Sequence, residues 1–542
     1  MPKLMQTGIE GLDRVLCGGF LYHNSILLKG APGCGKTTLG MQIIYNGATL
    51  YDEPGVIVLF EQFPQQLFRD VSSYGWDLRG LEEQGKLRVL FSEPEEVVSP
   101  DRMIDPPLVS KVQAAAYEIG ARRVLVDSVS HILNLTRDQR EARELLLRFI
   151  NALKSIGLTP VLTAEAENTA GAIGVDEYLT DCVLNLSSEA ARNKTFAIRE
   201  LSIRKTRGHD HLRGRHVFRL TNRGVEVFPR TPGRLPESSV TTGGALARLS
   251  SGISGLDELL GGGYTQGTST IIAGMPGTFK TTLGVQFVTK GARSDEKCIL
   301  VSFSERPGFL ARLMEEKGLP VGAMVSEGRL KILHYVPKET FMEEVLAHLE
   351  AEFRAGGVTR LTVDGINEIE RGIEEPDAYK DILQAFLTLC QAYGVTALFT
   401  QKLEQLSGTS PLSNINYASM FDGIIYLGTL EIESAVHKVV SVLKMRGGAF
   451  STDLCEITCD SKGLTVLDKF VGLSGILSGN AQGQYKKTVE ELFQPLYFIR
   501  DFLEMLGSPD VDEAQRAMII ENLRAEANKL VDKLKTHFNV KQ

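Results

Sequence analysis

The sequence predicts an α/β fold of two tandem domains with mainly parallel sheets, followed by a C-terminal helical hairpin. The first observation is a repeat, because the segment 30–38 recurs with changes as 274–282. The second is that short apolar runs alternate with helical stretches in both halves, which favours parallel sheets covered on both faces. The third is that residues 476–542 belong to neither copy and carry apolar residues at helical spacing.

The domain boundaries follow from composition and length. We predict a first domain over residues 1–230, a linker rich in Pro, Gly and Ser over 231–247, and a second domain over 248–475. A chain of 542 residues exceeds what one hydrophobic core usually covers, which supports the division. The expected strands are residues 25–29, 56–60, 123–127 and 159–163, then 270–273, 298–301, 360–364 and 395–399.

Bulk composition narrows the functional classes. Hydrophobic residues make up 43% and charged residues 23%, which is typical of a soluble globular protein. No apolar run is long enough to span a bilayer, and the N-terminus lacks a signal-peptide pattern. The seven cysteines form no metal or disulfide pattern, so we expect a reducing cytoplasm. A net charge of −8 argues against nucleic acid as the main partner.

The segment 30–38 forms a complete phosphate-binding loop (P-loop). Its glycines let backbone N–H groups surround phosphate oxygens, the lysine reaches the β- and γ-phosphates, and the first threonine hydroxyl ligates Mg²⁺. A strand before it and a helix after it add the positive end of the helix to the site. We therefore predict binding of ATP with Mg²⁺. The binding residues are Gly30, Pro32, Gly33, Cys34, Gly35, Lys36, Thr37 and Thr38.

The second loop keeps the lysine and threonine but has phenylalanine where the first has glycine. A side chain at Phe279 removes conformational freedom and could crowd the phosphates. Alternatively, the backbone keeps the loop and only the ring points away. We favour retained, altered nucleotide binding. The candidate residues are Gly274, Gly277, Thr278, Phe279, Lys280, Thr281 and Thr282.

Two aspartates each end an apolar strand after the P-loop. Asp127 and Asp364 stand where such a residue holds Mg²⁺ directly or through water. An aspartate at a strand end is also common in turns, but the repetition favours the metal role. The predicted magnesium ligands are therefore Thr37 with Asp127 and Thr281 with Asp364.

A carboxylate follows the second strand of the first domain. Glu61 is placed to orient and polarise the water that attacks the γ-phosphate. Aligning the flanking Phe and Pro residues places Ser304 at this position in the second domain, with Glu305 one step on. Because side chains alternate along a strand, Glu305 is not an obvious substitute. Surface exposure without a catalytic role is the alternative for either glutamate.

A basic segment recurs late in each domain. Lys205 and Arg207 are matched by Lys444 and Arg446, and the two cations of each pair share one strand face. They lie far along the chain from their own P-loop, so they are candidates to reach the γ-phosphate of a neighbouring subunit. A solvated basic edge is the alternative.

Taken together, these motifs resemble the KaiC family of RecA-like P-loop ATPases. The resemblance covers roughly residues 1–475 and rests on the paired P-loops, Phe-Glu-Gln-x-Pro at 60–64, Val-Asp-Ser at 126–128 and both Lys-x-Arg-Gly segments. It also includes Gly-x-x-Gly-Leu-Asp at 8–13 and 252–257. The resemblance implies double-ringed homohexamers with ATP at subunit interfaces. It also implies that the Lys-x-Arg pair reaches ATP on the adjacent subunit.

The chain departs from this family at the second domain. Family members autophosphorylate adjacent Ser and Thr residues there, and local alignment places Ala418 and Ser419 at these positions. One acceptor is therefore missing, Ser419 is the remaining candidate phosphoacceptor, and Ser304 and Phe279 depart as described above. These differences argue against a clock-type autokinase cycle. The C-terminal helices are also longer than the family's short tail.

The sequence therefore predicts a cytoplasmic, ring-forming ATPase. Its first domain is the main hydrolase, and its second domain has a nucleotide-binding or regulatory role. The catalytic residues are Lys36, Glu61, Lys205 and Arg207. Three alternatives stay open: an autophosphorylating serine/threonine kinase of clock or signalling type, a nucleic-acid-dependent ATPase like RecA and DnaB, and an ATP-gated scaffold. The scaffold would capture a protein partner through its C-terminal helices.

Overall fold

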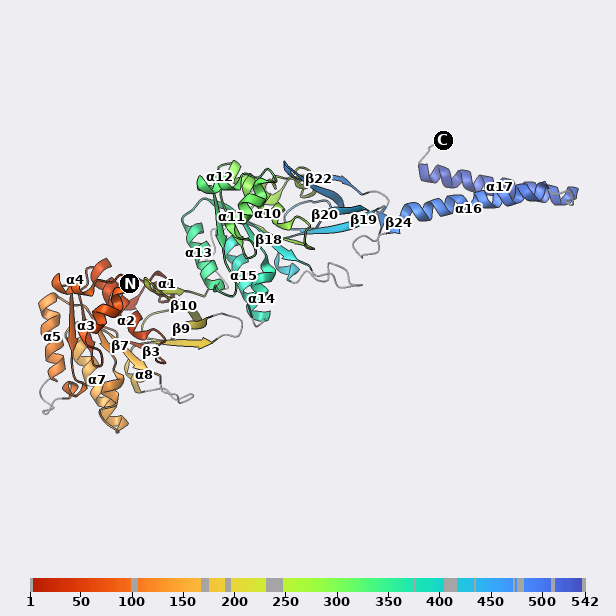
Figure 1. The fold of residues 1–542 in the computed structure, drawn as a ribbon. Coiled ribbons are helices and arrows are strands. Elements are labelled where there is room, and N and C mark those ends of the chain that lie inside the picture. Colours follow the sequence, from red (N-terminus) through yellow and green to blue (C-terminus); the bar gives the residue numbers. More distant parts are fainter. Residues whose placement is uncertain are drawn as a thin grey trace. The chain divides into compact units, whose positions relative to one another are not determined.

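The structure is a computed structural model, and it divides into two compact units. The first is built mainly from residues 1–238 and the second mainly from residues 239–542. The structure describes residues 3–98, 106–166, 175–190, 196–230, 247–373, 376–403, 417–432, 435–470, 473–474, 482–507 and 512–538. Figure 1 shows the order of the elements within each unit. The linker predicted over 231–247 falls almost wholly outside the described residues, so the exact boundaries stay predictions.

A nine-stranded sheet forms the frame of the first unit. Its strand order is β11-β10-β9-β8-β3-β7-β6-β4-β5. The strands from β8 to β5 in this order run parallel, whereas β9, β10 and β11 continue the sheet antiparallel. The bounds are β3 Ile26–Gly30, β4 Gly55–Leu59, β5 Leu87–Phe91, β6 Arg123–Asp127, β7 Thr159–Glu165, β8 Cys182–Ala190, β9 Ala197–Thr206, β10 Arg215–Thr221 and β11 Gly224–Phe228.

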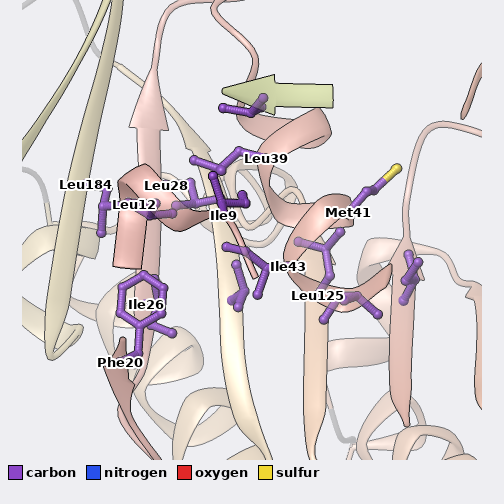
Figure 2. Close-up of a cluster of buried hydrophobic side chains, with 14 of the residues drawn as sticks. Ile9, Leu12, Phe20, Ile26, Leu28, Leu39, Met41, Ile43, Leu125 and Leu184 are labelled. Carbon is purple, nitrogen blue, oxygen red and sulfur yellow. The ribbon is translucent and has the colours of Figure 1, made fainter. Parts of the chain in front are cut away.

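Helices connect these strands, and alternate strand residues pack into two separate hydrophobic clusters. Ile26 and Leu28 of β3 join one cluster, shown in Figure 2, whereas Leu27 joins the other. The sheet is therefore buried on both faces, as parallel sheets require. The helices are α1 Glu10–Val15, α2 Lys36–Leu50, α3 Pro64–Ser72, α4 Leu78–Glu83, η1 Pro94–Val97, α5 Pro107–Ile119, α6 Ser130–Leu133, α7 Gln139–Ser155 and α8 Val175–Leu179, with a small β1–β2 pair at Leu4–Met5 and Phe20–Leu21.

The second unit repeats the same topology. Its nine-stranded sheet has the order β16-β15-β17-β18-β14-β19-β20-β21-β22, which is the first sheet read from the opposite edge. The strands from β16 to β19 are parallel and the last three are antiparallel. The bounds are β14 Ser269–Gly274, β15 Lys297–Ser302, β16 Leu330–His334, β17 Val358–Asp364, β18 Thr396–Lys402, β19 Gly423–Ile432, β20 Ala435–Met445, β21 Cys455–Asp460 and β22 Gly463–Lys469.

The remaining elements include the predicted C-terminal helices. Helices α16, Gln484–Leu506, and α17, Glu513–Phe538, contact each other side by side (Figure 1). The fold class predicted from the sequence is therefore confirmed. The other elements are α9 Leu256–Leu259, α10 Lys280–Arg293, α11 Pro307–Glu315, α12 Val321–Ser326, α13 Met342–Arg354, α14 Ile366–Arg371, α15 Pro376–Ala392 and η3 Ala418–Met420, with the short strands β12 Arg248–Leu249, β13 Tyr264–Thr265, β23 Leu473–Ser474 and β24 Gln482–Gly483. Within the described residues, no helix is long and apolar enough to cross a membrane.

Candidate functional site

The first P-loop joins the end of β3 to the start of α2. Gly33 has φ 75° and Gly35 has φ 106°, and both values lie in the left-handed region where glycine is unstrained. Gly35 immediately precedes the helix, so its conformation turns the chain into α2. The free N–H groups of the first helical turn and the positive end of the helix dipole then face the loop. This geometry is the phosphate cradle expected from the sequence.

Lys36 lies against its own loop. Its Nζ donates hydrogen bonds to the carbonyl oxygens of Gly30, at 2.8 Å, and Ala31, at 3.0 Å. The residue is only 9% exposed. The ammonium group is therefore held at the mouth of the cradle by weak neutral acceptors. A phosphate oxygen would replace them with a charge-assisted partner, which is the stronger interaction.

Asp127 lies at the carboxyl ends of the parallel strands, on the same side of the sheet as the P-loop. It ends β6 and pairs with Leu59, the last residue of β4, and its carboxylate accepts a hydrogen bond from the Thr163 hydroxyl on β7. Because β3, β7, β6 and β4 are parallel, their carboxyl ends meet at this one edge. The Thr37 hydroxyl and the Asp127 carboxylate are the oxygen ligands that Mg²⁺ prefers, with phosphate oxygens and water completing its octahedron.

Glu61 follows β4 at the same edge. Its side chain is 78% exposed, and its Oε1 lies 3.0 Å from Nε2 of His131 on α6. The Phe60 N–H donates to the carbonyl oxygen of Asp127 at 3.4 Å, which fixes the start of this loop beside the aspartate. Glu61 therefore reaches solvent on the same side of the sheet as the phosphate cradle. His131 was not identified from the sequence, because only the fold brings α6 beside the end of β4.

Lys205 and Arg207 lie on the side of the sheet where the parallel strands begin, opposite to the side that carries the P-loop. Lys205 is on β9 and pairs with Val183 near the start of β8, where the strand enters the sheet beside the start of β3. Strand β3 has five residues, so this place is about 16 Å from the P-loop at the other end. The pair cannot serve its own P-loop without crossing the sheet. The role expected for the pair on a neighbouring subunit stays a prediction.

The two cations are held by groups just before β8. Nζ of Lys205 donates to the carbonyl oxygens of Glu177, at 3.0 Å, and Tyr178, at 3.3 Å. Burial and the charge of Arg207 lower the pKa of Lys205. Arg207 forms an ion pair with Asp181 at 3.4 Å, yet its side chain remains 60% exposed. Arg207 is therefore oriented by a fixed carboxylate while its guanidinium stays accessible from outside.

The second P-loop keeps the backbone of the first. Phe279 has φ 70° and ψ 17°, compared with φ 106° and ψ 15° at Gly35, so both residues enter the helix through the left-handed region. Gly277 is also left-handed, with φ 78°. The backbone therefore retains the loop despite the added side chain. Of the two interpretations left open by the sequence, this conformation favours the second.

Lys280 and Thr281 also have their expected neighbours. Nζ of Lys280 donates to the Met275 carbonyl at 2.6 Å, and burial lowers the pKa of Lys280 to about 8. The Thr281 hydroxyl is 3.1 Å from both carboxylate oxygens of Asp364, and the Thr400 hydroxyl donates to one of them at 2.6 Å. The structure thus brings the predicted ligands Thr281 and Asp364 together. Burial raises the pKa of Asp364.

The basic segment of the second unit repeats the edge arrangement of the first. Lys444 donates to the Phe421 carbonyl at 2.5 Å, and Arg446 pairs with Asp422 at 3.2 Å. Ser419 lies on η3 just before this aspartate and is exposed. The N–H of Asp422 donates to the Ser269 carbonyl at the start of β14. The candidate phosphoacceptor therefore lies at the edge opposite its own P-loop.

A charge reversal beside the two P-loops was not identified from the sequence. Glu165 ends β7 and pairs with Gly30, whereas Lys402 ends β18 and pairs with Gly274. Aligning Thr163-Ala164-Glu165 with Thr400-Gln401-Lys402 would have revealed it. Among the described residues, no group of three or more His, Cys, Asp or Glu side chains could hold a metal ion by itself.

Comparison with known proteins agrees with this geometry. A family model described as the KaiC ATPase matches the chain twice, over residues 5–232 and 249–470. The chain belongs to the KaiC family. Each match contains one nine-stranded sheet and one P-loop, so the KaiC ATPase domain occurs here in tandem. Helices α16 and α17 lie beyond the second match.

Curated relatives share most of the chain. The circadian clock oscillator protein KaiC of Parathermosynechococcus lividus is 31% identical over 485 residues, which cover 89% of this chain and 88% of that protein. The KaiC protein of Synechococcus elongatus is 31% identical, with 88% and 91% covered. That of Prochlorococcus marinus is 30% identical, with 88% and 95% covered. These proteins are similar to this chain in both ATPase domains.

Proposed function

We propose that the first unit is the principal ATP hydrolase of a ring formed by copies of this chain. The observation that carries this proposal is the meeting of the intact glycine loop, Lys36, Asp127 and Glu61 at one edge of one sheet. The second unit has Phe279 and Ser304 at two of the matching positions. Its loop serves as a regulatory nucleotide site.

The proposed mechanism assigns each side chain one role. The backbone N–H groups of the loop and Lys36 bind the phosphate chain and balance the negative charge on the γ-phosphate. Thr37 and Asp127 would hold Mg²⁺, which supplies charge neutralisation between the β- and γ-phosphates. Glu61 orients the attacking water and takes up its proton, while His131, 3.0 Å away, orients Glu61.

The site is completed by a second copy of the chain. Lys205 and Arg207 lie at the edge opposite their own P-loop, so they reach the γ-phosphate of the next subunit in a head-to-tail ring. We propose a homohexamer, as the family resemblance implies. All seven cysteines are free thiols, in keeping with the cytoplasmic location that we propose.

The C-terminal helices are the proposed contact with a protein partner. They carry exposed apolar side chains, which at such density are typical of interaction surfaces. We expect deletion of residues 485–542 to abolish capture of that partner and to leave ATP turnover unchanged. Among the described side chains of these helices, at least half of the surface is exposed at Tyr497, Phe498, Leu503, Met505 and Met518.

The test of the proposed division of labour is ATP turnover by the wild type, Lys36→Ala and Lys280→Ala, with bound nucleotide counted for each. We expect Lys36→Ala to lower turnover at least about 100-fold, because it removes the cation at the developing charge. Lys280→Ala should retain turnover. If Lys280→Ala abolishes turnover while Lys36→Ala does not, the active unit is assigned wrongly. A covalent phosphate on Ser419 after incubation with ATP would instead favour the autokinase.

A further inference from the structure

The Phe279 ring of the second P-loop has a defined set of partners. Nζ of Lys438 on β20 lies 3.6 Å from the ring centroid, and Nζ of Lys317, just after α11, lies 5.9 Å from it. The ring also packs against the hydrophobic cluster of the second unit, together with Cys459 of β21. These contacts place the ring beside two cations, an arrangement that cation–π attraction stabilises.

The strand order of the second sheet indicates on which side of the second P-loop the Phe279 ring lies. The γ-phosphate end of a bound nucleotide faces Asp364 on β17, because that carboxylate and Thr281 form the magnesium side. Strand β14, which carries the loop, lies between β18 on that side and β19 on the other. The α-phosphate and the nucleoside of a bound nucleotide must therefore extend toward β19, β20 and β21. Lys438, which contacts the ring, belongs to β20, so the ring lies on the nucleoside side.

The surroundings of Gly35 in the first unit can be compared with those of Phe279, its counterpart in the second unit. A Cβ added to Gly35 would lie 3.3 Å from Leu220 and 3.6 Å from Phe218, both on β10. The turns Thr221–Gly224 and Asp460–Gly463 close the matching hairpins, and this register makes Leu220 the counterpart of Cys459. A large side chain beside a glycine in the first unit is thus replaced by a small side chain beside a phenylalanine in the second.

Lys317 links the ring to the start of the helix. Its Nζ donates to the Thr282 hydroxyl, at 2.9 Å, in the first turn of α10. The ring, this lysine and Lys438 therefore form one packed group directly beside the phosphate cradle, while Lys280 and the loop N–H groups lie on the phosphate side. The second P-loop therefore retains its phosphate cradle, and the Phe279 ring and the two lysines fill the space beside the cradle.

We propose that Phe279 is a specificity-determining residue whose ring occupies the space of the nucleoside at the second P-loop. The loop then accepts a bare phosphate chain, such as inorganic tripolyphosphate, in preference to a nucleoside triphosphate. ATP enters only when the ring is displaced, so the second site has a lower ATP affinity than the first. This inference rests on the proposed function, in which the second loop is a regulatory nucleotide site that binds the phosphates of its ligand.

The experiment is a calorimetric titration of the full chain with Mg-ATP and with Mg-tripolyphosphate. All variants carry Lys36→Ala to weaken the first site, and second-site binding is defined as the part that Lys280→Ala removes. We expect Phe279→Gly to raise the affinity for ATP at least about 10-fold and to change the affinity for tripolyphosphate far less. The deciding quantity is the ratio of the two affinities.

Phe279→Ala is the matched control, because it removes the ring but keeps a Cβ at the left-handed position. The same change in the affinity ratio with Ala and with Gly would assign the effect to the ring rather than to loop strain. An unchanged ratio in both variants, or wild-type ATP binding as tight as that of Phe279→Gly, would overturn the inference. If no variant shows Lys280-dependent tripolyphosphate binding, the proposed phosphate site itself is wrong, and the inference falls with it.

Discussion

The two P-loops share a backbone and differ in what surrounds it. A non-glycine residue in the left-handed region costs about 1 kcal/mol, yet Phe279 adopts it as Gly35 does. The packing of the ring against Lys438 and the hydrophobic cluster of the second unit offsets this cost. The comparison teaches that a P-loop can keep its backbone path when a glycine is replaced, because side chains on neighbouring strands pack against the new ring.

The charges around the two P-loops also differ. At the carboxyl ends of its parallel strands the first unit has two carboxylates, Glu61 after β4 and Glu165 at the end of β7, whereas Ser304 and Lys402 stand at the matching positions of the second. Carboxylates suit the activation of water, and a lysine suits the retention of phosphate. The difference therefore supports hydrolysis in the first unit and binding in the second.

The largest expected effect separates the two basic edges. Arg207→Ala should lower ATP turnover about 1,000-fold, since an arginine that reaches the γ-phosphate from another subunit contributes this much or more. Arg446→Ala is the matched variant and should leave turnover nearly unchanged. Mixing Arg207→Ala with Lys36→Ala subunits should restore part of the activity, because some interfaces then combine an intact lysine with an intact arginine. Failure of the mixture to regain turnover would contradict action between subunits.

The carboxylates offer the next test. Glu61→Gln should lower turnover about 100-fold while ATP binding persists, because the amide cannot accept the proton of the attacking water. Glu305→Gln, which changes the neighbouring glutamate of the second unit, should have little effect. Turnover and nucleotide binding would be measured on the same preparations. Normal hydrolysis by a Glu61→Gln protein that binds ATP would show that the catalytic assignment is wrong.

The sequence was sufficient for the parts of the site that are local in the chain. The motif around Lys36 specifies strand, loop and helix within a few residues, and apolar runs before Asp127 and Asp364 predicted their strand ends correctly. The outcome at Phe279 was not predictable in this way. Its ring packs against Lys438, which is far along the chain and is brought near only by the pairing of β14 with β19 and of β19 with β20.

The position of the basic segments relative to the P-loops also depends on the topology of the sheet. Spacing in the sequence placed Lys205 far from its P-loop along the chain, but chain distance does not give distance in space. The antiparallel pairing of β9 with β8 puts Lys205 at the opposite edge of the sheet. His131 escaped prediction for a similar reason, because a lone histidine on a short helix carries no signal until its neighbour Glu61 is known.

A smaller effect is expected from the protonation of Lys280. Burial lowers its pKa to about 8, so the side chain is charged at pH 7 and mostly neutral at pH 9. Binding of tripolyphosphate at the second loop should therefore weaken about 10-fold between these two pH values. Lys280→Arg should bind with little pH dependence, because a guanidinium stays charged throughout. A wild-type affinity that is constant from pH 7 to 9 would contradict this role.

The smallest effect concerns Lys402, which faces the same loop as Lys280. Its positive charge lowers the pKa of Lys280, whereas Asp364 raises it. Lys402→Gln should therefore move the midpoint of the pH profile upward, and affinity at pH 9 relative to pH 7 should rise about twofold, the scale of an exposed charge interaction. Added salt should diminish the difference, since it screens exposed charges. Lys297→Gln is the matched control, because Lys297 begins β15 at the opposite edge of the sheet. An equal shift in both variants would mean that total charge, rather than the position of Lys402 beside the loop, sets the profile.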